Sequence, residues 1–262
     1  RVGGPTWLTF WAAIFTAGVF IFATYHWWVA TCVSGLLATA TVLIWLWTGT
    51  AIPPEKPKKS VGLGAEAPLY VSGPQAVGWW AMFITMLGDM TAFSSLVFGY
   101  FFYWTIHDDF PPHPSPGPGT FWPLLGGTLI ASAWLLSCAA RRWNRDDRPL
   151  EFYAAIALAS VSGLAGGAAL LAGPWLSRLD PTAHVYAATV WVLVGWTAVH
   201  TALGVLMNLY CAARRGAGLM TAEYDADITN VRLYWHFVAL TVLITVAVIA
   251  GFPLVAGAPV PP

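Results

Sequence analysis

Long apolar stretches alternate with short polar segments along the whole chain. Each apolar stretch approaches or exceeds the roughly 20 residues that an α-helix needs to cross a membrane. We predict seven such spans, of which the third and sixth, near 30 residues each, are long enough to tilt strongly or to extend beyond the hydrocarbon. The predicted spans are residues 6–25, 28–51, 76–105, 120–140, 151–173, 184–213 and 232–256.

The composition supports a membrane protein. The chain is 58% hydrophobic and 9% charged, with 16 Trp, 14 Phe and 9 Tyr, a balance that the surface of a water-soluble globule cannot carry. We therefore predict an all-α polytopic membrane protein. The formal net charge is zero and the charges lie in short segments between spans, so no nucleic-acid partner is expected.

The basic residues predict the topology. When alternate loops are assigned to one side of the membrane, 11 basic residues fall on that side and one, Arg178, falls on the other. The positive-inside rule then places the N-terminus in the cytoplasm and the C-terminus outside. The cytoplasmic set is Arg1, Lys56, Lys58, Lys59, Arg141, Arg142, Arg145, Arg148, Arg214, Arg215 and Arg232.

A segment rich in Pro, Lys and Gly divides the spans into two groups. We predict a two-helix transmembrane unit over residues 1–52, a cytoplasmic linker over 53–75 and a five-helix transmembrane bundle over 76–262, all within one domain. No repeat of fixed period is visible, so neither a solenoid nor an inverted-repeat transporter is favoured. The chain opens without Met and without the n-region of a signal peptide, so we expect a fragment or processed product.

Asp89 is an acid in the middle of the third predicted span, 13 residues after its start at residue 76. At about 1.5 Å per residue it lies roughly 20 Å along the helix, where a charge costs at least about 2.5 kcal/mol. An acid at this depth indicates a function. The structural alternative is a protonated acid that donates one hydrogen bond across a helix interface. Gly88 beside it suits close helix packing.

His200 lies at the same predicted depth in the sixth span, about 13 residues from its inner end. A carboxylate and an imidazole at one level can share a proton, which offsets the cost of burying either group. Pairing with Asp89 is one interpretation, and a bond to a backbone or hydroxyl group is the other. Gly204 in the same span would let a neighbouring helix approach closely.

His236 stands about four residues into the last predicted span, beside Arg232 and Trp235. Aromatic rings with a cation at headgroup depth can bind a lipid phosphate, although an ordinary aromatic belt gives the same pattern. These three residues are candidate lipid ligands. The arginine-rich segment at 141–151 is interpreted as a cytoplasmic loop that anchors the topology.

The remaining candidate ligands for metals and cofactors give little support to redox chemistry. The only lysines are Lys56, Lys58 and Lys59, which excludes a retinal Schiff base in the last span, and no span supplies the His and Cys cluster of a copper centre. His200 is deep and His236 is shallow, so they do not form a pair of axial His at matched depth for haem. A haem near the outer surface would have to use His26 and His184 at the helix ends, and this alternative has little support. We expect no metal or cofactor in this chain. Two further groups are expected to be inert: His107 and His113, solvated beside Asp108 and Asp109, and Cys32, Cys138 and Cys211, interpreted as buried small hydrophobes.

Three segments resemble the signatures of cytochrome c oxidase subunit III. They are WWAMFITMLGDMTAFSSLVFGYFFYW, VHTALGVLMNLY and NVRLYWHFVAL, and the match runs in order over residues 76–256. The resemblance implies seven helices divided two plus five by a lipid-filled cleft, with the N-terminus inside a bacterial plasma membrane. It also implies the partners: subunit I and subunit II of a haem-copper oxidase, which hold the haem and copper, and bound phospholipid.

The resemblance assigns roles position by position. The family's intramembrane glutamate falls on Asp89, the second histidine of its HGxH segment on His200, and a glycine of that segment on Gly204. The chain departs from the pattern at three positions, with Thr197 and Ala198 in place of the first His and the Gly of HGxH, and Ala239 in place of the acid that often follows YWHFV.

The resemblance implies an accessory subunit without a catalytic centre of its own. Such a subunit belongs to an oxygen-reducing, proton-translocating oxidase, binds lipid and sustains proton uptake and stability of the catalytic subunit. The segment VGLGAEAPLYVSGPQ and the missing Met favour a chain that follows subunit I on one polypeptide. Two alternatives are a proton-coupled secondary transporter that uses Asp89 and a purely structural membrane scaffold.

Overall fold

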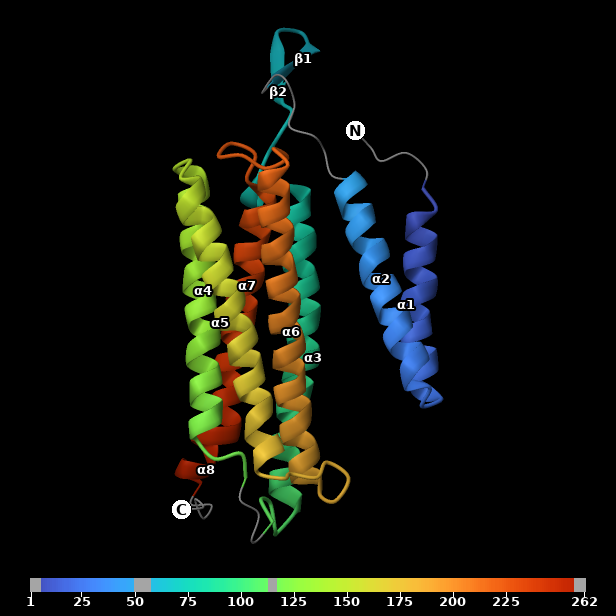
Figure 1. The fold of residues 1–262 in the computed structure, drawn as a ribbon, viewed down its shortest axis with the longest axis vertical. Helices are drawn as coiled ribbons and strands as arrows, with labels where there is room; N and C mark the ends of the chain where they lie inside the picture. Colours follow the sequence, from blue (N-terminus) through green and yellow to red (C-terminus); the bar gives the residue numbers. More distant parts are fainter. Residues whose placement is uncertain (1–5, 50–57, 113–116, 257–262) are drawn as a thin grey trace. The chain divides into compact units, whose positions relative to one another are not determined.

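The computed structural model describes residues 6–49, 58–112 and 117–256, and this part of the chain is helical apart from one small hairpin (Figure 1). Helices of near-membrane length dominate, as the apolar pattern predicts. They are α1 (Leu8–Thr24), α2 (Trp28–Gly49), α3 (Val77–Ile106), α4 (Phe121–Arg145), α5 (Pro149–Leu176), α6 (Val185–Gly216) and α7 (Ala226–Val246), followed by a π-helical turn (Ala247–Gly251) and α8 (Phe252–Val255).

Six of the helical segments are long and apolar enough to cross a membrane, by length and composition. The protein is therefore an all-α polytopic membrane protein, as predicted. Helix α1 is shorter, at 17 residues. The third and sixth spans form long helices, since α3 has 30 residues and α6 has 32. Helix α5 is also long, with 28 residues.

The chain divides into two compact units, residues 1–57 and 58–262. In the first unit, α1 and α2 are joined by only three residues, so they pack as an antiparallel pair. Gly18 of α1 lies against Ser34 of α2, where an added Cβ would stand 2.9 Å from the Ser34 hydroxyl oxygen. Small residues at this contact let the two helices approach closely.

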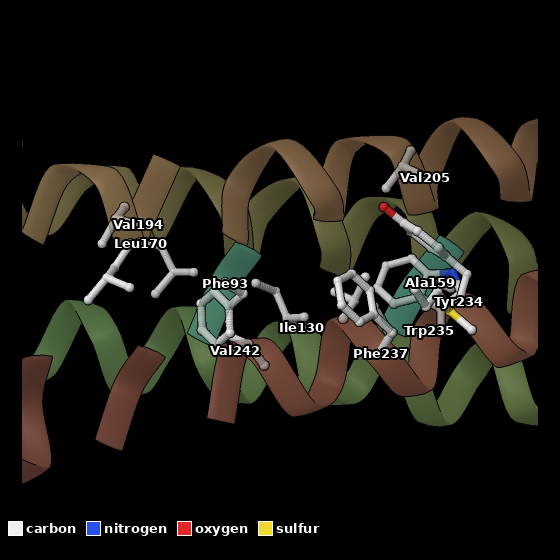
Figure 2. Packing of buried hydrophobic residues seen from close by; sticks show 14 of the residues in the cluster. Phe93, Ile130, Ala159, Leu170, Val194, Val205, Tyr234, Trp235, Phe237 and Val242 are labelled. Atoms are coloured by element: carbon white, nitrogen blue, oxygen red, sulfur yellow. The ribbon is translucent and has the colours of Figure 1, made fainter. Parts of the chain in front are cut away.

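The second unit is a bundle whose tightest contact joins α4 to α5. Gly126 and Gly166 oppose each other there, and a Cβ added at Gly126 would lie 2.8 Å from the Gly166 carbonyl oxygen. Helix α6 packs on α5, and α7 packs on α3, α4 and α6. The apolar interior of this bundle includes Phe93, Ile130 and Leu170, which are fully buried (Figure 2).

Four predicted helix boundaries at the arginine-rich end are wrong, and in each case the helix is longer than predicted. Residues 141–151 are not a loop, because α4 continues to Arg145 and α5 begins at Pro149. The last helix begins at Ala226, six residues before the predicted start at 232, and α6 continues to Gly216, three residues past its predicted end at 213. The apolar pattern marks only the membrane-embedded length of a helix. Charged residues that form ion pairs let the helix continue beyond that length.

The predicted linker contains secondary structure. Strands β1 (Lys58–Gly62) and β2 (Ala65–Pro68) form an antiparallel hairpin, followed by a 3₁₀ turn, η1 (Gly73–Gln75). Gly62 and Gly64 flank its tip with φ of +96° and +74°, which glycine adopts without steric cost. The prediction that all three cysteines are buried is also wrong: Cys211 is buried, but Cys138 is half-buried and Cys32 is exposed.

Candidate functional site

Asp89 and His200 face each other between α3 and α6. The Oδ2 atom of Asp89 lies 3.8 Å from the Nε2 atom of His200, within range of an ion pair but longer than a hydrogen bond. The His200 side chain is 10% exposed and that of Asp89 is 39% exposed, so the acid lies at the edge of the bundle and not in its interior. The structure thus brings together the two residues for which the sequence left pairing open.

The backbone fixes how the His200 ring carries its proton. The Nδ1 atom lies 2.8 Å from the carbonyl oxygen of Trp196, one helical turn earlier. Because a carbonyl oxygen only accepts, Nδ1 must be the donor and carry a hydrogen. The Nε2 atom, which faces Asp89, is then free to gain or lose a proton. The ring thus has a backbone hydrogen bond at Nδ1, while Asp89 lies within ion-pair range of Nε2.

Aromatic residues hold the His200 ring in place. The Trp196 ring stacks on it with centroids 4.4 Å apart, and the Phe237 ring meets it edge-on at 5.5 Å. The Tyr234 hydroxyl donates to the His200 carbonyl oxygen at 3.2 Å. These contacts leave the imidazole little rotational freedom, so its Nε2 atom stays directed at α3.

The pair has simple acid–base chemistry. One proton can reside on Asp89 beside a neutral imidazole, or it can reside on Nε2 to give an imidazolium beside a carboxylate. Either arrangement keeps the pair neutral overall, which reduces the cost of placing these groups inside a membrane. The geometry is suited to holding a proton at one defined point near the middle of α3.

The two glycines predicted to serve helix packing behave differently. Gly204 lies under the indole of Trp235, and a Cβ added there would meet two ring carbons at 3.1 Å. A Cβ added at Gly88 would meet nothing within 4 Å among the described residues. Gly204 therefore serves close packing between α6 and α7, whereas Gly88 makes no close approach to another helix in the described part of the chain.

Only two of the three candidate lipid ligands lie where lipid could reach them. Arg232 and His236 are one helical turn apart and share a face of α7, but Trp235 is 0% exposed and packs inside the bundle. His236 lies ten residues after the helix start at Ala226, not four, which corrects the predicted position at the helix end. An exposed patch of α7 can still present Arg232 and His236 to lipid.

Contacts from α4 support this patch. The Trp134 indole N–H donates to Nδ1 of His236 at 2.6 Å, which leaves the Nε2 atom of the ring as the outward-facing group. The Nε atom of Arg232 is buried and has no hydrogen-bond partner among the described residues. Arg141 lies near enough to interact electrostatically with Arg232. The Arg232 charge, with no ion pair within 4.0 Å among the described residues, suits a phosphate.

Sequence reasoning missed a network of buried ion pairs at the arginine-rich end. The Arg214 side chain is 2% exposed, and its Nε atom donates to Oδ2 of Asp227 at 2.6 Å. Arg141 lies 3.6 Å from Asp225 and donates to the Thr229 hydroxyl oxygen at 2.9 Å. These arginines hold helices together in addition to any role in topology.

Arg215 adds a third link, to the end of α4 and to the turn that follows it. It donates to the Asn144 side-chain oxygen and, at 2.9 Å, to Asp147. A sequence signal for the buried position of Arg214 does exist. Arg214 continues a stripe of small or polar residues at helical spacing along the buried face of α6. The stripe is formed by Thr197, Thr201, Gly204, Asn208 and Cys211.

At the other end of the bundle, His184 and His107 have structural contacts. The Nδ1 atom of His184 accepts the Tyr186 N–H at 3.0 Å and caps α6, while its Nε2 atom lies 3.5 Å from Asp109. The His107 and His184 rings are 6.2 Å apart. His113 lies outside the described residues. Within the described ranges, no group of three or more His, Cys, Asp or Glu is placed to hold a metal ion.

Comparisons with protein-family models and with curated proteins find no match to this chain.

Proposed function

We propose that this chain is the non-redox accessory subunit of a proton-pumping haem-copper terminal oxidase, similar to cytochrome c oxidase subunit III. The observation that carries the proposal is the Asp89–His200 pair, with 3.8 Å between the two side chains. These are the two positions onto which the family's intramembrane acid and histidine fall. Order and spacing of the three signature segments add support.

The proposal extends to topology. At about 1.5 Å per residue, the 17 residues of α1 span roughly 25 Å, close to the thickness of the hydrocarbon core. We propose that α1 also crosses, which gives seven spans divided two plus five, with the N-terminus in the cytoplasm of a bacterial cell. The partners are subunit I, on the same or a separate polypeptide, and subunit II, which hold the haem and copper.

The Asp89–His200 pair acts in this proposal as a proton-holding group at the edge of the bundle. The partial exposure of Asp89 gives its carboxyl a route to water or to a neighbouring subunit, while the buried His200 fixes its position. A pair of this kind sustains proton uptake by a catalytic subunit without any redox centre of its own. Arg232 and His236 bind a phospholipid phosphate that stabilises the complex.

The test uses the purified complex with Asp89→Asn or His200→Gln, and Asp146→Asn as the control, because Asp146 is an exposed acid at the far end of α4. We expect the first two variants to lose proton-pumping efficiency and to inactivate sooner during turnover, with the control unchanged. Protons translocated per electron and activity over successive turnovers are the measurements. Full pumping and full lifetime in both variants would rule the proposal out.

A proton-coupled secondary transporter is the second candidate, because a partly exposed intramembrane acid beside a histidine also fits a proton relay. Proteoliposomes that contain this chain alone separate the two. Proton-dependent solute uptake that Asp89→Asn abolishes would favour the transporter. A third candidate, a structural scaffold, predicts a carboxyl band of Asp89 that does not change during infrared titration.

A further inference from the structure

The connection between α5 and α6 carries an open cavity of about 820 Å³. This connection lies at the end of the bundle opposite the α4–α5 turn (Figure 1). The cavity is therefore at the opposite end from the arginine-rich ion pairs. This cavity is separate from the Asp89–His200 pair and from the Arg232 face. Its lining includes Trp175, Leu176, Arg178, Asp180, Pro181 and Trp191.

The cavity contains one cation and one anion that do not neutralise each other. Arg178 and Asp180 are exposed and two residues apart, and no ion pair within 4.0 Å involves Arg178 in the described part of the chain. Arg178 has a left-handed backbone, with φ of 52°. The lining of the cavity thus includes one exposed positive charge and one exposed negative charge.

The local structure keeps Asp180 ionised and partly available. Its Oδ1 atom accepts from the Thr182 hydroxyl at 2.7 Å and from the Thr182 N–H at 2.8 Å. These bonds stabilise the carboxylate and hold the pKa of Asp180 below its usual value. Both bonds reach Oδ1, and an interaction with the Ala183 backbone N–H also favours the ionised carboxylate.

The apolar part of the lining matches a membrane interface. Trp175 is 73% exposed at the end of α5, and Leu176 beside it is also exposed. The Trp191 indole N–H donates to the Leu179 carbonyl oxygen at 2.8 Å, which fixes that ring as a wall. Tryptophan prefers headgroup depth, where its ring contacts acyl chains and its N–H remains solvated or bonded.

We propose that this cavity binds a phospholipid whose zwitterionic headgroup carries a phosphate and a primary ammonium, with Arg178 on the phosphate and Asp180 on the ammonium. A guanidinium is a strong donor to phosphate oxygens, and an ammonium with N–H groups can donate to the exposed carboxylate of Asp180. The upper part of the acyl chains lies against Trp175 and Leu176. The two charges of the headgroup then match the two charges of the turn.

The same chemistry disfavours other lipids. An anionic headgroup such as that of phosphatidylglycerol satisfies Arg178 but offers no cation to Asp180. A choline headgroup is a cation without N–H donors, so it loses the hydrogen bond to Asp180. This site requires only that the chain is embedded in a membrane, and it does not depend on the proposed oxidase function.

The experiment measures lipid retention by the purified full chain in native mass spectrometry. The chain is titrated with phosphatidylethanolamine, phosphatidylcholine and phosphatidylglycerol in separate runs. We expect one retained phosphatidylethanolamine, bound roughly fivefold to tenfold more tightly than phosphatidylcholine because one charge-assisted hydrogen bond is lost. Equal retention of the three lipids, or tighter binding of phosphatidylglycerol, would overturn the proposal.

Two variants assign the residues. Arg178→Gln is expected to weaken the binding of phosphatidylethanolamine about tenfold, since it removes the positive charge that contacts the phosphate. Asp180→Asn keeps an oxygen that accepts from Thr182 but removes the charge, so it should abolish the preference for phosphatidylethanolamine over phosphatidylcholine. Arg142→Gln, at the opposite end of the bundle, is the matched control and should change nothing. Unchanged lipid selectivity in both site variants would contradict the assignment.

Discussion

The indole N–H of Trp235 in α7 donates to the side-chain oxygen of Asn208 in α6 at 3.1 Å, and both side chains are fully buried. The ring lies over Gly204, whose missing side chain provides its space. Figure 2 shows Trp235 among the buried residues of the bundle. One aromatic residue thus joins two helices by both a hydrogen bond and close packing.

Gly204→Ala should destabilise the bundle. The added Cβ would stand 3.1 Å from the Trp235 ring, and overpacking of this kind costs about 1–3 kcal/mol. Gly195→Ala in the same helix is the control, because a Cβ there meets nothing within 4 Å. Thermal unfolding in detergent compares the two. A Gly204→Ala protein as stable as the Gly195→Ala protein would contradict the packing argument.

Gly166→Ala should be more harmful than Gly167→Ala, although the two glycines are neighbours in α5. A Cβ at Gly166 would lie 2.9 Å from the Gly126 carbonyl oxygen and 3.0 Å from the Ile130 nitrogen, both of which are backbone atoms that move only with α4. At Gly167 the nearest atom is 4.0 Å away. We expect Gly166→Ala to lower the unfolding temperature and Gly167→Ala to leave it unchanged or raise it, since alanine favours helix.

Arg214→Ala should cost about 3–5 kcal/mol of unfolding free energy, because it leaves the half-buried carboxylate of Asp227 without its partner. The double variant Arg214→Met with Asp227→Leu should recover part of this loss, since it removes both charges. Arg142→Ala is the control: its pair with Asp146 is exposed and should contribute less than about 1 kcal/mol. A double-mutant cycle gives the coupling. Equal losses at Arg214 and Arg142 would refute the role of burial.

The partly buried hydroxyl of Tyr70 should make the folded protein less stable at alkaline pH. Burial raises the pKa of its hydroxyl, which accepts the Ala226 N–H at the start of α7. A raised folded-state pKa means that the stabilisation is complete below the ordinary tyrosine pKa of about 10 and is lost as pH rises through the folded value.

Tyr70→Phe removes both the acceptor and the titrating group. Near neutral pH we expect this variant to be less stable by about 1 kcal/mol, the typical worth of one hydrogen bond. The difference from the wild type should narrow above about pH 10, because only the wild type has this hydroxyl to ionise. Denaturant unfolding at a series of pH values provides the measurement, and a difference independent of pH would contradict the prediction.

The sequence by itself determined the helical membrane class. Inside a membrane, the backbone N–H and C=O groups of an apolar stretch must be hydrogen-bonded within the protein, and an α-helix does this within one segment. The spans therefore follow from local composition. Depth along a helix is also local, because each residue adds a fixed rise, and this placed Asp89 and His200 at one level before any packing was known. The positions of Trp196 and Phe237 around the imidazole had no such signal.

Only the tertiary structure decided which side of each helix faces a neighbour. Trp235 and His236 are adjacent in sequence, yet one is buried under Gly204 and the other is exposed on α7, because successive helix residues point about 100° apart. In lipid, apolar residues suit the interior and the outer face equally, so hydropathy cannot separate the two. Helix pairing decides that Arg214 faces Asp227 and that Gly126 approaches Gly166. Pairing is a property of the assembled bundle.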